Sequence, residues 1–288
     1  MSGNDQINES VEAQTKIRKN FRFKIQKYIK PPFLNYYLFI LALLTTGLAQ
    51  GVWYSIAVIT ILFAHEMGHY LMCRRYGINA TLPFFIPIPP PLNPFGTMGA
   101  VIRMEGKIPT RKALFDVGIA GPLAGLFFTI IALIIGLSLP SPVAEGNGEG
   151  IALGTPLLFN WMAKWLNPAL ISDPDSLIHP VAFAGWVGLF ITSLNLLPIG
   201  QLDGGHVIYG ILGPNSKYIY RIALIGFAIN AAFYPPWVIF FILLLSFGFN
   251  HPPPLNDVEP LDRKRKILGA LTFFVFFISF IPFPFHIF

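Results

Sequence analysis

Long apolar stretches alternate with short polar ones along this chain of 288 residues, a pattern typical of proteins that cross a membrane several times. A membrane-spanning helix needs about 20 predominantly apolar residues, and most of these stretches approach that length. The pattern predicts seven spanning segments, at residues 34–50, 52–73, 112–139, 180–198, 218–233, 236–249 and 267–284. The sixth is short, so we expect it to form a tight hairpin with the fifth around Pro235 and Pro236.

Three stretches between these segments have an unusual composition. Residues 81–99 are apolar but rich in proline, so they cannot form a helix, and we expect them to dip back into the membrane interface. Residues 100–104 predict a short strand, which is either part of an interfacial loop or an edge strand that pairs with an extended substrate. Residues 155–167 predict a helix that lies on the outer membrane surface.

Composition supports a membrane protein. The chain is 54% hydrophobic and 12% charged, whereas a soluble domain carries about 25% charged residues. A single cysteine excludes an internal disulfide framework and a four-cysteine zinc site. The expected fold class is therefore an all-α polytopic membrane protein, with about seven transmembrane helices and a small re-entrant loop or β-strand element after the second helix.

The net charge of +6 indicates membrane orientation, not nucleic-acid binding, because the basic residues lie in the predicted loops. A cytoplasmic N-terminus places residues 1–33, 74–111, 199–217 and 250–266 inside. With the residues at their edges, these segments hold 19 of the 20 Lys and Arg, and only Lys164 falls outside. The positive-inside rule therefore predicts a cytoplasmic N-terminus and an outer C-terminus. No apolar stretch precedes the first long one, so we expect no cleavable signal peptide.

The second apolar segment ends in His65-Glu66-Met67-Gly68-His69, a His-Glu-x-x-His metal signature. On a helix, residues four apart lie one above the other, so His65 and His69 face the same way and can bind one ion. Glu66 is the residue type that takes a proton from a metal-activated water and later passes it to a leaving amine. Charged and polar groups inside an apolar helix are costly unless something binds them, so the motif predicts hydrolysis within or at the edge of a bilayer.

Two histidines leave zinc short of the three protein ligands of a catalytic site, so a third must reach the same depth. The fourth apolar segment ends at the same membrane face as the second, and Asp203 follows it directly. Pro198 and the glycines after Asp203 break the helix, which is tolerable only beside a cavity. We therefore expect Asp203 to complete the site with His65 and His69.

Other residues near these motifs have alternative interpretations. Cys73 and His206 are rival ligands, although packing suits Cys73 and a supporting or interfacial role suits His206. Asp116 either pairs with Lys112, makes a snorkelling contact near the membrane interface, or supports the site. Small residues on one face of the third segment favour tight helix packing, at Gly118, Gly121 and Gly125.

The motifs together resemble the site-2 protease family of intramembrane zinc metalloproteases, in its bacterial and chloroplast branch. The resemblance rests on three elements in order, each matching a family pattern: His65 to His69, Gly121-Pro-Leu-Ala-Gly125, and Asn195 through Asp203-Gly204. It implies one zinc ion per chain, held by His65, His69 and Asp203, with Glu66 as general base and acid. It also implies that Asn195 helps to stabilise the oxyanion.

The resemblance divides the chain into three regions: a basic, partly disordered cytoplasmic tail (1–33), an intramembrane metalloprotease core (34–215) and additional C-terminal transmembrane helices (216–288). The expected function is a zinc metalloendopeptidase that cuts transmembrane segments of other membrane proteins near the cytoplasmic side, in a bacterial inner or cell membrane. Its expected partners are the substrate helix and the lipid bilayer. The alternative is a membrane protein that binds or transports a divalent metal, in which Glu66 has no necessary role.

Overall fold

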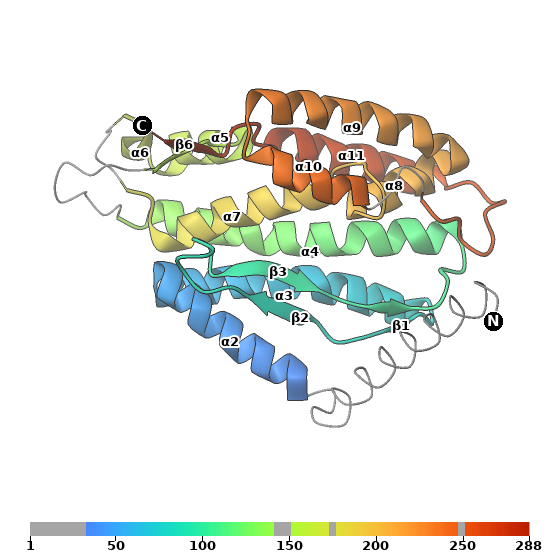
Figure 1. The fold of residues 1–288 in the computed structure, drawn as a ribbon, viewed down its shortest axis with the longest axis horizontal. Coiled ribbons are helices and arrows are strands. Elements are labelled where there is room, and N and C mark those ends of the chain that lie inside the picture. Colours follow the sequence, from blue (N-terminus) through green and yellow to red (C-terminus); the bar gives the residue numbers. More distant parts are fainter. Residues whose placement is uncertain (1–32, 141–150, 173–176, 247–250, 288) are drawn as a thin grey trace, which may run out of the picture.

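The computed structural model describes residues 33–140, 151–172, 177–246 and 251–287, which fold mainly into helices (Figure 1). The helices are α2 (Phe33–Gln50), α3 (Val52–Arg75), α4 (Arg111–Ser138), α5 (Leu157–Leu166), α6 (Ala169–Ser172), α7 (Pro180–Asn195), α8 (Asp203–Leu212), the 3-10 turn η1 (Gly213–Asn215), α9 (Ser216–Phe233), α10 (Trp237–Ser246) and α11 (Arg263–Ser279). The strands are β1 (Asn79–Ala80), β2 (Phe84–Pro87), β3 (Thr97–Val101), β4 (Met104–Glu105), β5 (Ile151–Leu153) and β6 (Phe285–Ile287).

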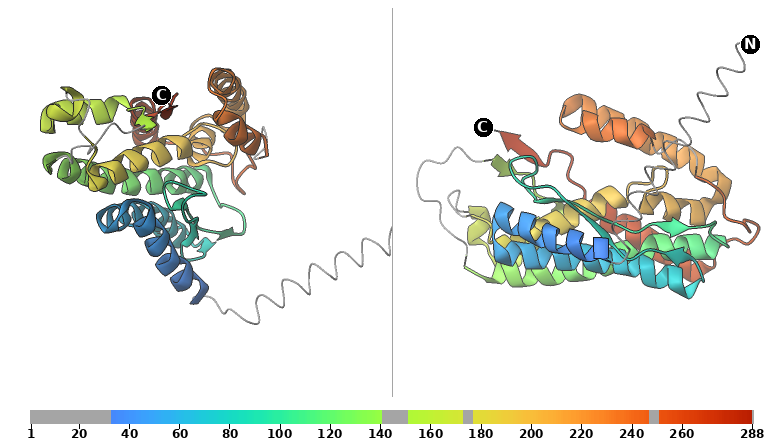
Figure 2. Two further views of the ribbon diagram at one scale, coloured as in Figure 1. Left: turned by 60° about the vertical axis from the view of Figure 1, so that its left-hand side comes forward. Right: turned by 60° about the horizontal axis from the view of Figure 1, so that its bottom comes forward.

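Helix α4 lies at the centre of the molecule. It packs against α3 on one side and against α7 and α8 on the other. Helix α2 and the β2–β3 hairpin cover the far side of α3, while α9, α10 and α11 lie beyond α7 and α8 (Figures 1 and 2). Residues from α3 and α8 can therefore meet across the small side chains of α4.

Local sequence signals explain where these helices begin and end. Thr110 caps α4, because its side-chain oxygen accepts a hydrogen bond of 3.1 Å from the backbone N–H of Ala113. Helix α7 begins at Pro180, whose missing N–H costs nothing in a first turn. It ends at Asn195, shortly before Pro198, and a new helix starts only at Asp203. The predicted break at Pro198 is thus confirmed, whereas the glycines after Asp203, which were also expected to break the helix, lie in the first turn of α8.

Three helices of the described residues are long and apolar enough to cross a membrane, namely α2, α3 and α4. Helices α7 and α10 are apolar but shorter. The predicted count of seven spans is not confirmed, since α7 stops before Pro198 and α11 begins with a charged first turn. The predicted hairpin of the fifth and sixth segments is confirmed, because α9 and α10 pack together after a turn at Pro235 and Pro236.

The segment after α3 is non-helical, as its prolines predict, but its strands differ from the prediction. The strand expected at residues 100–104 is instead two separate strands, β3 and β4. Strand β3 pairs antiparallel with β2, which lies inside the proline-rich stretch, and β4 pairs with β1. Asn35 of α2 donates to the carbonyls of Leu82 and Pro83, at 2.9 and 3.0 Å, so this irregular backbone is satisfied by a neighbouring helix.

The main core lies between α4, α7 and the aromatic side chains around Trp186. Trp186 is fully buried, stacks on Phe183 and Phe190, and donates its indole N–H to the carbonyl of Gly154 at 2.8 Å. Leu133 of α4 packs directly on Gly185 of α7, where a Cβ atom would meet it at 2.6 Å. This close approach fixes the position of α7, which leads into the functional site.

The remaining predictions have mixed outcomes. The helix expected at residues 155–167 is confirmed as α5, and the pairing of β5 with β6 was not predicted. The expected disorder of the N-terminal tail concerns residues 1–32, which lie outside the described residues.

Candidate metal centre

Helix α3 presents two buried imidazoles on one face, as the spacing of its motif predicts. The Nε2 atoms of His65 and His69 lie 3.1 Å apart, and the ring centroids are separated by 4.9 Å. Both residues are at least nine-tenths buried. Two histidines that converge in this way offer half of a tetrahedral coordination shell.

Asp203, the first residue of α8, brings a carboxylate to the same point. Its Oδ2 atom lies 3.2 Å from His65 Nε2 and 3.3 Å from His69 Nε2. The turn before α8 is tight enough that a Cβ atom at Gly204 would lie 2.0 Å from the Leu196 carbonyl oxygen, so only glycine fits there. The three candidate ligand atoms lie within 4.8 Å of one another.

Hydrogen bonding determines which atom of His69 faces this point. Its Nδ1 atom lies 2.8 Å from the backbone carbonyl oxygen of Val117 in α4, and a carbonyl can only accept. Nδ1 therefore carries the hydrogen, and a neutral imidazole turns its Nε2 lone pair toward the Asp203 carboxylate. Two electron-rich atoms at 3.3 Å repel each other unless a proton or a metal cation lies between them. The donor set of two imidazoles and one carboxylate thus fits a divalent cation and suits zinc.

Two further residues of the predicted site border this group. Glu66 is buried beside His65, and its carboxylate lies close to the backbone of Ile102, just past the end of β3. The Nδ2 atom of Asn195, at the end of α7, lies 3.3 Å from His65 Nε2. The structure therefore gathers all five predicted site residues in one place, although their roles stay predictions.

The small residues of α4 have a more specific role than the helix packing predicted for them. A Cβ atom at Gly121 would lie 2.0 Å from His69 Nε2, and one at Gly125 would lie 3.1 Å from His65 Nδ1. These glycines bring the backbone of α4 against the two imidazoles and leave the rings room to converge. The sequence showed the small-residue face but not what it packs against.

The rival residues lie apart from the three candidate ligand atoms. Cys73 is buried in a small apolar cluster with Ile78 and Val117, which agrees with the packing role favoured for it. His206 faces His251, with Nδ1 and Nε2 separated by 2.5 Å.

The predicted pairing of Asp116 with Lys112 is wrong. Asp116 instead receives the guanidinium of Arg265 in α11, and Lys112 pairs with Glu259. Both partners lie almost 150 residues further along the chain, so neither was visible from local spacing.

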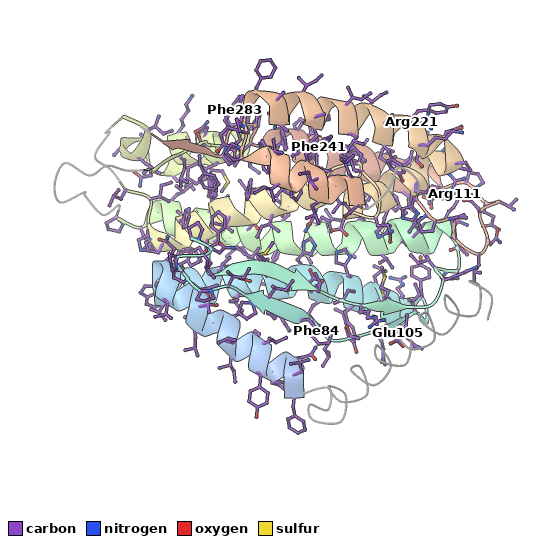
Figure 3. All side chains as sticks on the ribbon, viewed as in Figure 1. Phe84, Glu105, Arg111, Arg221, Phe241 and Phe283 are labelled. Carbon is purple, nitrogen blue, oxygen red and sulfur yellow. The ribbon has the colours of Figure 1, made fainter. Side chains whose placement is uncertain are left out.

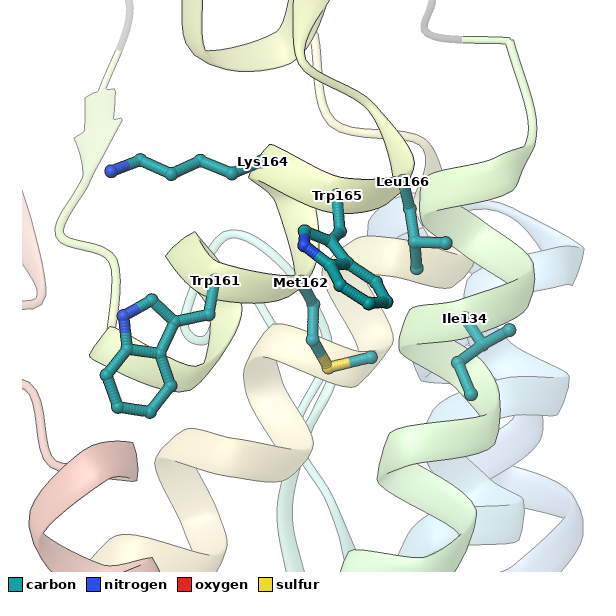
Figure 4. Close-up of a pocket in the computed structure, with 6 residues that line it drawn as sticks. All are labelled: Ile134, Trp161, Met162, Lys164, Trp165 and Leu166. Atoms are coloured by element: carbon teal, nitrogen blue, oxygen red, sulfur yellow. The ribbon is translucent and has the colours of Figure 1, made fainter.

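A groove of about 660 Å³ lies far from this site, between α5 and the outer part of α4 (Figure 4). It is lined by Ile134, Trp161, Met162, Lys164, Trp165 and Leu166. Among the described residues that line it there is no acidic residue, histidine or cysteine.

Comparison with known proteins gives consistent results. The model of peptidase family M50 matches residues 53–234, which include all five site residues. The chain is 29% identical over 234 residues to the probable chloroplastic zinc metalloprotease EGY1 of Oryza sativa subsp. japonica, covering 78% of this chain and 39% of that protein. It is 28% identical over 246 residues to the probable chloroplastic zinc metalloprotease EGY2 of Arabidopsis thaliana, covering 83% and 43% of the two chains.

The chain thus spans about two fifths of the length of the curated relatives it matches. The family model covers well over half of the chain and includes both the histidine motif and the aspartate motif. The resemblance inferred from these motifs is therefore confirmed, and the chain belongs to peptidase family M50, the site-2 protease family.

Proposed function

We propose that this protein is a zinc endopeptidase that cleaves transmembrane segments of other membrane proteins. His65, His69 and Asp203 hold one zinc ion per chain, and Glu66 is the general base and acid. One observation carries the proposal: three ligand atoms from two helices, α3 and α8, converge in a buried part of the molecule beside a glutamate. Membership of peptidase family M50 supports the same chemistry.

The residues of the site have distinct roles in the proposed reaction. Zinc supplies Lewis acidity to a water molecule and to the scissile carbonyl. Glu66 takes the proton of the attacking water and delivers it to the leaving amine. Its burial keeps this proton from bulk solvent, and the backbone of Ile102 lies close to its carboxylate.

Asn195 is the candidate for oxyanion stabilisation. Its side-chain amide borders the ligand group, 3.3 Å from His65 Nε2, and an amide N–H is a donor suited to developing negative charge. In a site with little water such a donor acts strongly, because nothing else screens the charge.

Strand β3 is the candidate for holding the substrate. A peptide bond in a helix is shielded and hydrogen-bonded, so a substrate helix must unwind before it is cut. Strand β3 pairs with β2 on one edge and ends one residue before Ile102, whose backbone reaches Glu66. A substrate strand added at this hairpin would run toward the candidate site.

The orientation in the membrane rests on charge. We propose that seven segments cross the bilayer and that the end of the bundle carrying Arg111 faces the cytoplasm, as the distribution of Lys and Arg supports. Cleavage then takes place near the cytoplasmic side. A bacterial cell membrane stays the predicted location.

A Glu66→Gln variant tests the proposed reaction. The substitution keeps the size of the side chain but removes the base, so cleavage of a co-expressed single-span substrate should fall by about 10² to 10⁴-fold while bound zinc stays near one per chain. Metal analysis of the purified protein and immunoblots of the substrate measure the two effects. A metal transporter would keep its transport activity in this variant. The alternative would be favoured if the wild-type protein cleaved no substrate and the Glu66→Gln variant still took up zinc.

Asp203→Ala tests the ligand set. Loss of one of three protein ligands should remove most of the bound zinc and all cleavage. Cys73→Ala is the control, because Cys73 is buried on the face of α3 that carries His65 and His69 but lies outside the ligand group. Unchanged zinc content in Asp203→Ala would reject this residue as a ligand.

A further inference from the structure

Residues 251–265, which we call the C-terminal clasp, lie beyond the part of the chain matched by the family model and bind back onto the core. The backbone N–H groups of Leu255 and Asn256 donate to the carbonyls of Ile108 and Pro109, each at 2.9 Å, just before α4 begins. Leu261 is buried with Phe115, Ile119 and Val207 of α4 and α8. The clasp is thus attached to α8, which carries Asp203, and to α4, which packs against the two imidazoles of α3.

The strongest contact of the clasp is an ion pair with two parallel hydrogen bonds. Arg265 Nε lies 2.7 Å from Asp116 Oδ1, and Arg265 Nη2 lies 2.6 Å from Asp116 Oδ2. The hydroxyl of Tyr76, which directly follows α3, donates to Asp116 Oδ2 at 2.6 Å. A forked guanidinium–carboxylate pair fixes both distance and angle, so this contact joins α3, α4 and α11 in one arrangement.

The Asp116 carboxylate is only 17% exposed and the Arg265 side chain 30% exposed. The hydrogen bonds that the Arg265 guanidinium donates to the Asp116 and Asp262 carboxylates raise the pKa of this guanidinium above its usual range. The guanidinium therefore stays charged at every physiological pH, and its contact with Asp116 is partly shielded from water, where such a contact is stronger than on an open surface.

This pair is adjacent to the group that orients a candidate ligand. Asp116 precedes Val117, whose carbonyl oxygen accepts the Nδ1 hydrogen of His69 at 2.8 Å. Tyr76 is seven residues, or two helical turns, beyond His69. A rotation of α4 against α3 would move the Val117 carbonyl away from His69, and the Arg265–Asp116–Tyr76 contact opposes that rotation.

The clasp also contacts α8, the helix that begins with Asp203. Asp257 accepts a hydrogen bond of 2.9 Å from the hydroxyl of Tyr209, and it lies 3.5 Å from Arg111 Nε of α4. Arg111 in turn donates to the carbonyl of Gly210 at 3.1 Å. The clasp therefore holds α8 against α4 at the same end of the bundle.

We propose that the C-terminal clasp positions the metal ligands, with Arg265 and Asp116 as its positioning residues. The proposal rests on the ligand set given under Proposed function. Groups that orient metal ligands without touching the metal typically change metal affinity or activity by about 10 to 100-fold when they are removed. Arg265 acts in this way through Asp116 and the Val117 carbonyl.

The test uses the full chain, purified in detergent and loaded with zinc. For Arg265→Ala we expect the half-life of bound zinc against a chelator, and kcat for a transmembrane substrate, each to fall by about 10-fold, with KM unchanged. Arg265→Lys keeps the charge but loses the fork, so it should give an intermediate loss. Exchange of the two charges, Asp116→Arg with Arg265→Asp, should restore part of the zinc half-life.

Glu259→Gln is the matched control. Like Arg265 and Asp116, Glu259 and Lys112 join the clasp to α4, with Oε2 and Nζ 2.9 Å apart. Both side chains are well exposed, however, and neither adjoins a ligand. This variant should keep the wild-type zinc half-life and kcat.

A zinc half-life within two-fold of wild type in folded Arg265→Ala would overturn the proposal. If the zinc-free form of the same variant also has a lower unfolding temperature, the contact is purely structural. If Arg265→Ala does not fold, Arg265→Lys decides by the same measurements. A wrong ligand set would be recognised separately, because Asp203→Ala would then keep its zinc.

Discussion

At the scale of single residues, glycine hydrogens are all that separate α4 from the two imidazoles of α3. His69 Nε2 occupies the space that a Cβ atom at Gly121 would need. The metal centre therefore depends on a residue that contributes no ligand and no hydrogen-bonding side chain.

Gly121→Ala should remove zinc binding and activity. The added methyl group would lie 2.0 Å from His69 Nε2 in the present geometry, so the ring must turn away or α4 must move outward. We expect a loss of at least about 10-fold in zinc affinity, measured by competition with a chromogenic chelator. Gly226→Ala is the control, since a Cβ atom at that helical position of α9 has no neighbour within 4 Å. Normal zinc affinity in Gly121→Ala would mean that the rings do not occupy this space.

Sequence reasoning succeeded at this scale where chemistry is local. Residues four apart on one helix made His65 and His69 a pair, and the helix break at Pro198 placed Asp203 nearby. It failed for the Val117 carbonyl, because every residue has one, and for Arg265, because its partner Asp116 lies 149 residues away. Spacing along the chain carries no signal for either contact.

At the scale of elements, the packing of α4 on α7 sets the depth of the site. Leu133 fills the surface above Gly185, and α7 leads from there to Asn195 and the turn before Asp203. A shift of α7 at this contact would therefore also displace Asn195, at the end of α7, and Asp203, after the turn that follows it.

Leu133→Ala should lower the free energy of unfolding by about 2 to 5 kcal/mol, because it leaves a cavity in a fully buried contact. Ile135→Ala, on the half-exposed face of the same helix, should change it by no more than about 0.5 kcal/mol. Equilibrium unfolding in mixed micelles measures both variants. Equal effects in the two variants would argue against a tight α4–α7 contact.

The hydrophobic pattern predicted the helices better than the strands. Helical segments carry their signal over many residues, so α3, α4 and α5 lie close to the predicted positions. The strands β3 and β4 are too short for a reliable pattern, and β2 lies in a proline-rich stretch that resembles a loop. The hydrogen-bond partners of this stretch come from Asn35 of α2 and from β3, and the local sequence does not reveal either of them.

At the scale of the whole molecule, the position of the basic side chains along the bundle bears on its orientation in the membrane. Figure 3 shows Arg111 and Arg221 toward one end and Phe283 nearer the other. The helices α3 and α4 run in opposite directions between these ends, as Figure 1 shows. His65 and His69 lie in the half of α3 that ends with Arg74 and Arg75, and this supports the proposal that cleavage takes place near the cytoplasmic face.

Cysteine labelling of the full-length chain in intact cells tests this orientation. The native Cys73 is fully buried and should stay unlabelled, so single exposed cysteines can be introduced without removing it. A membrane-impermeant maleimide should label Lys164→Cys and Phe283→Cys from outside, whereas Lys107→Cys and Asn215→Cys should react only after permeabilisation. Phe283 follows α11 and Asn215 precedes α9, so opposite accessibility of these two sites requires an odd number of crossings between them. Labelling of both from the same side would leave an even number and would show that one or all three of the helices α9, α10 and α11 do not cross the bilayer as proposed.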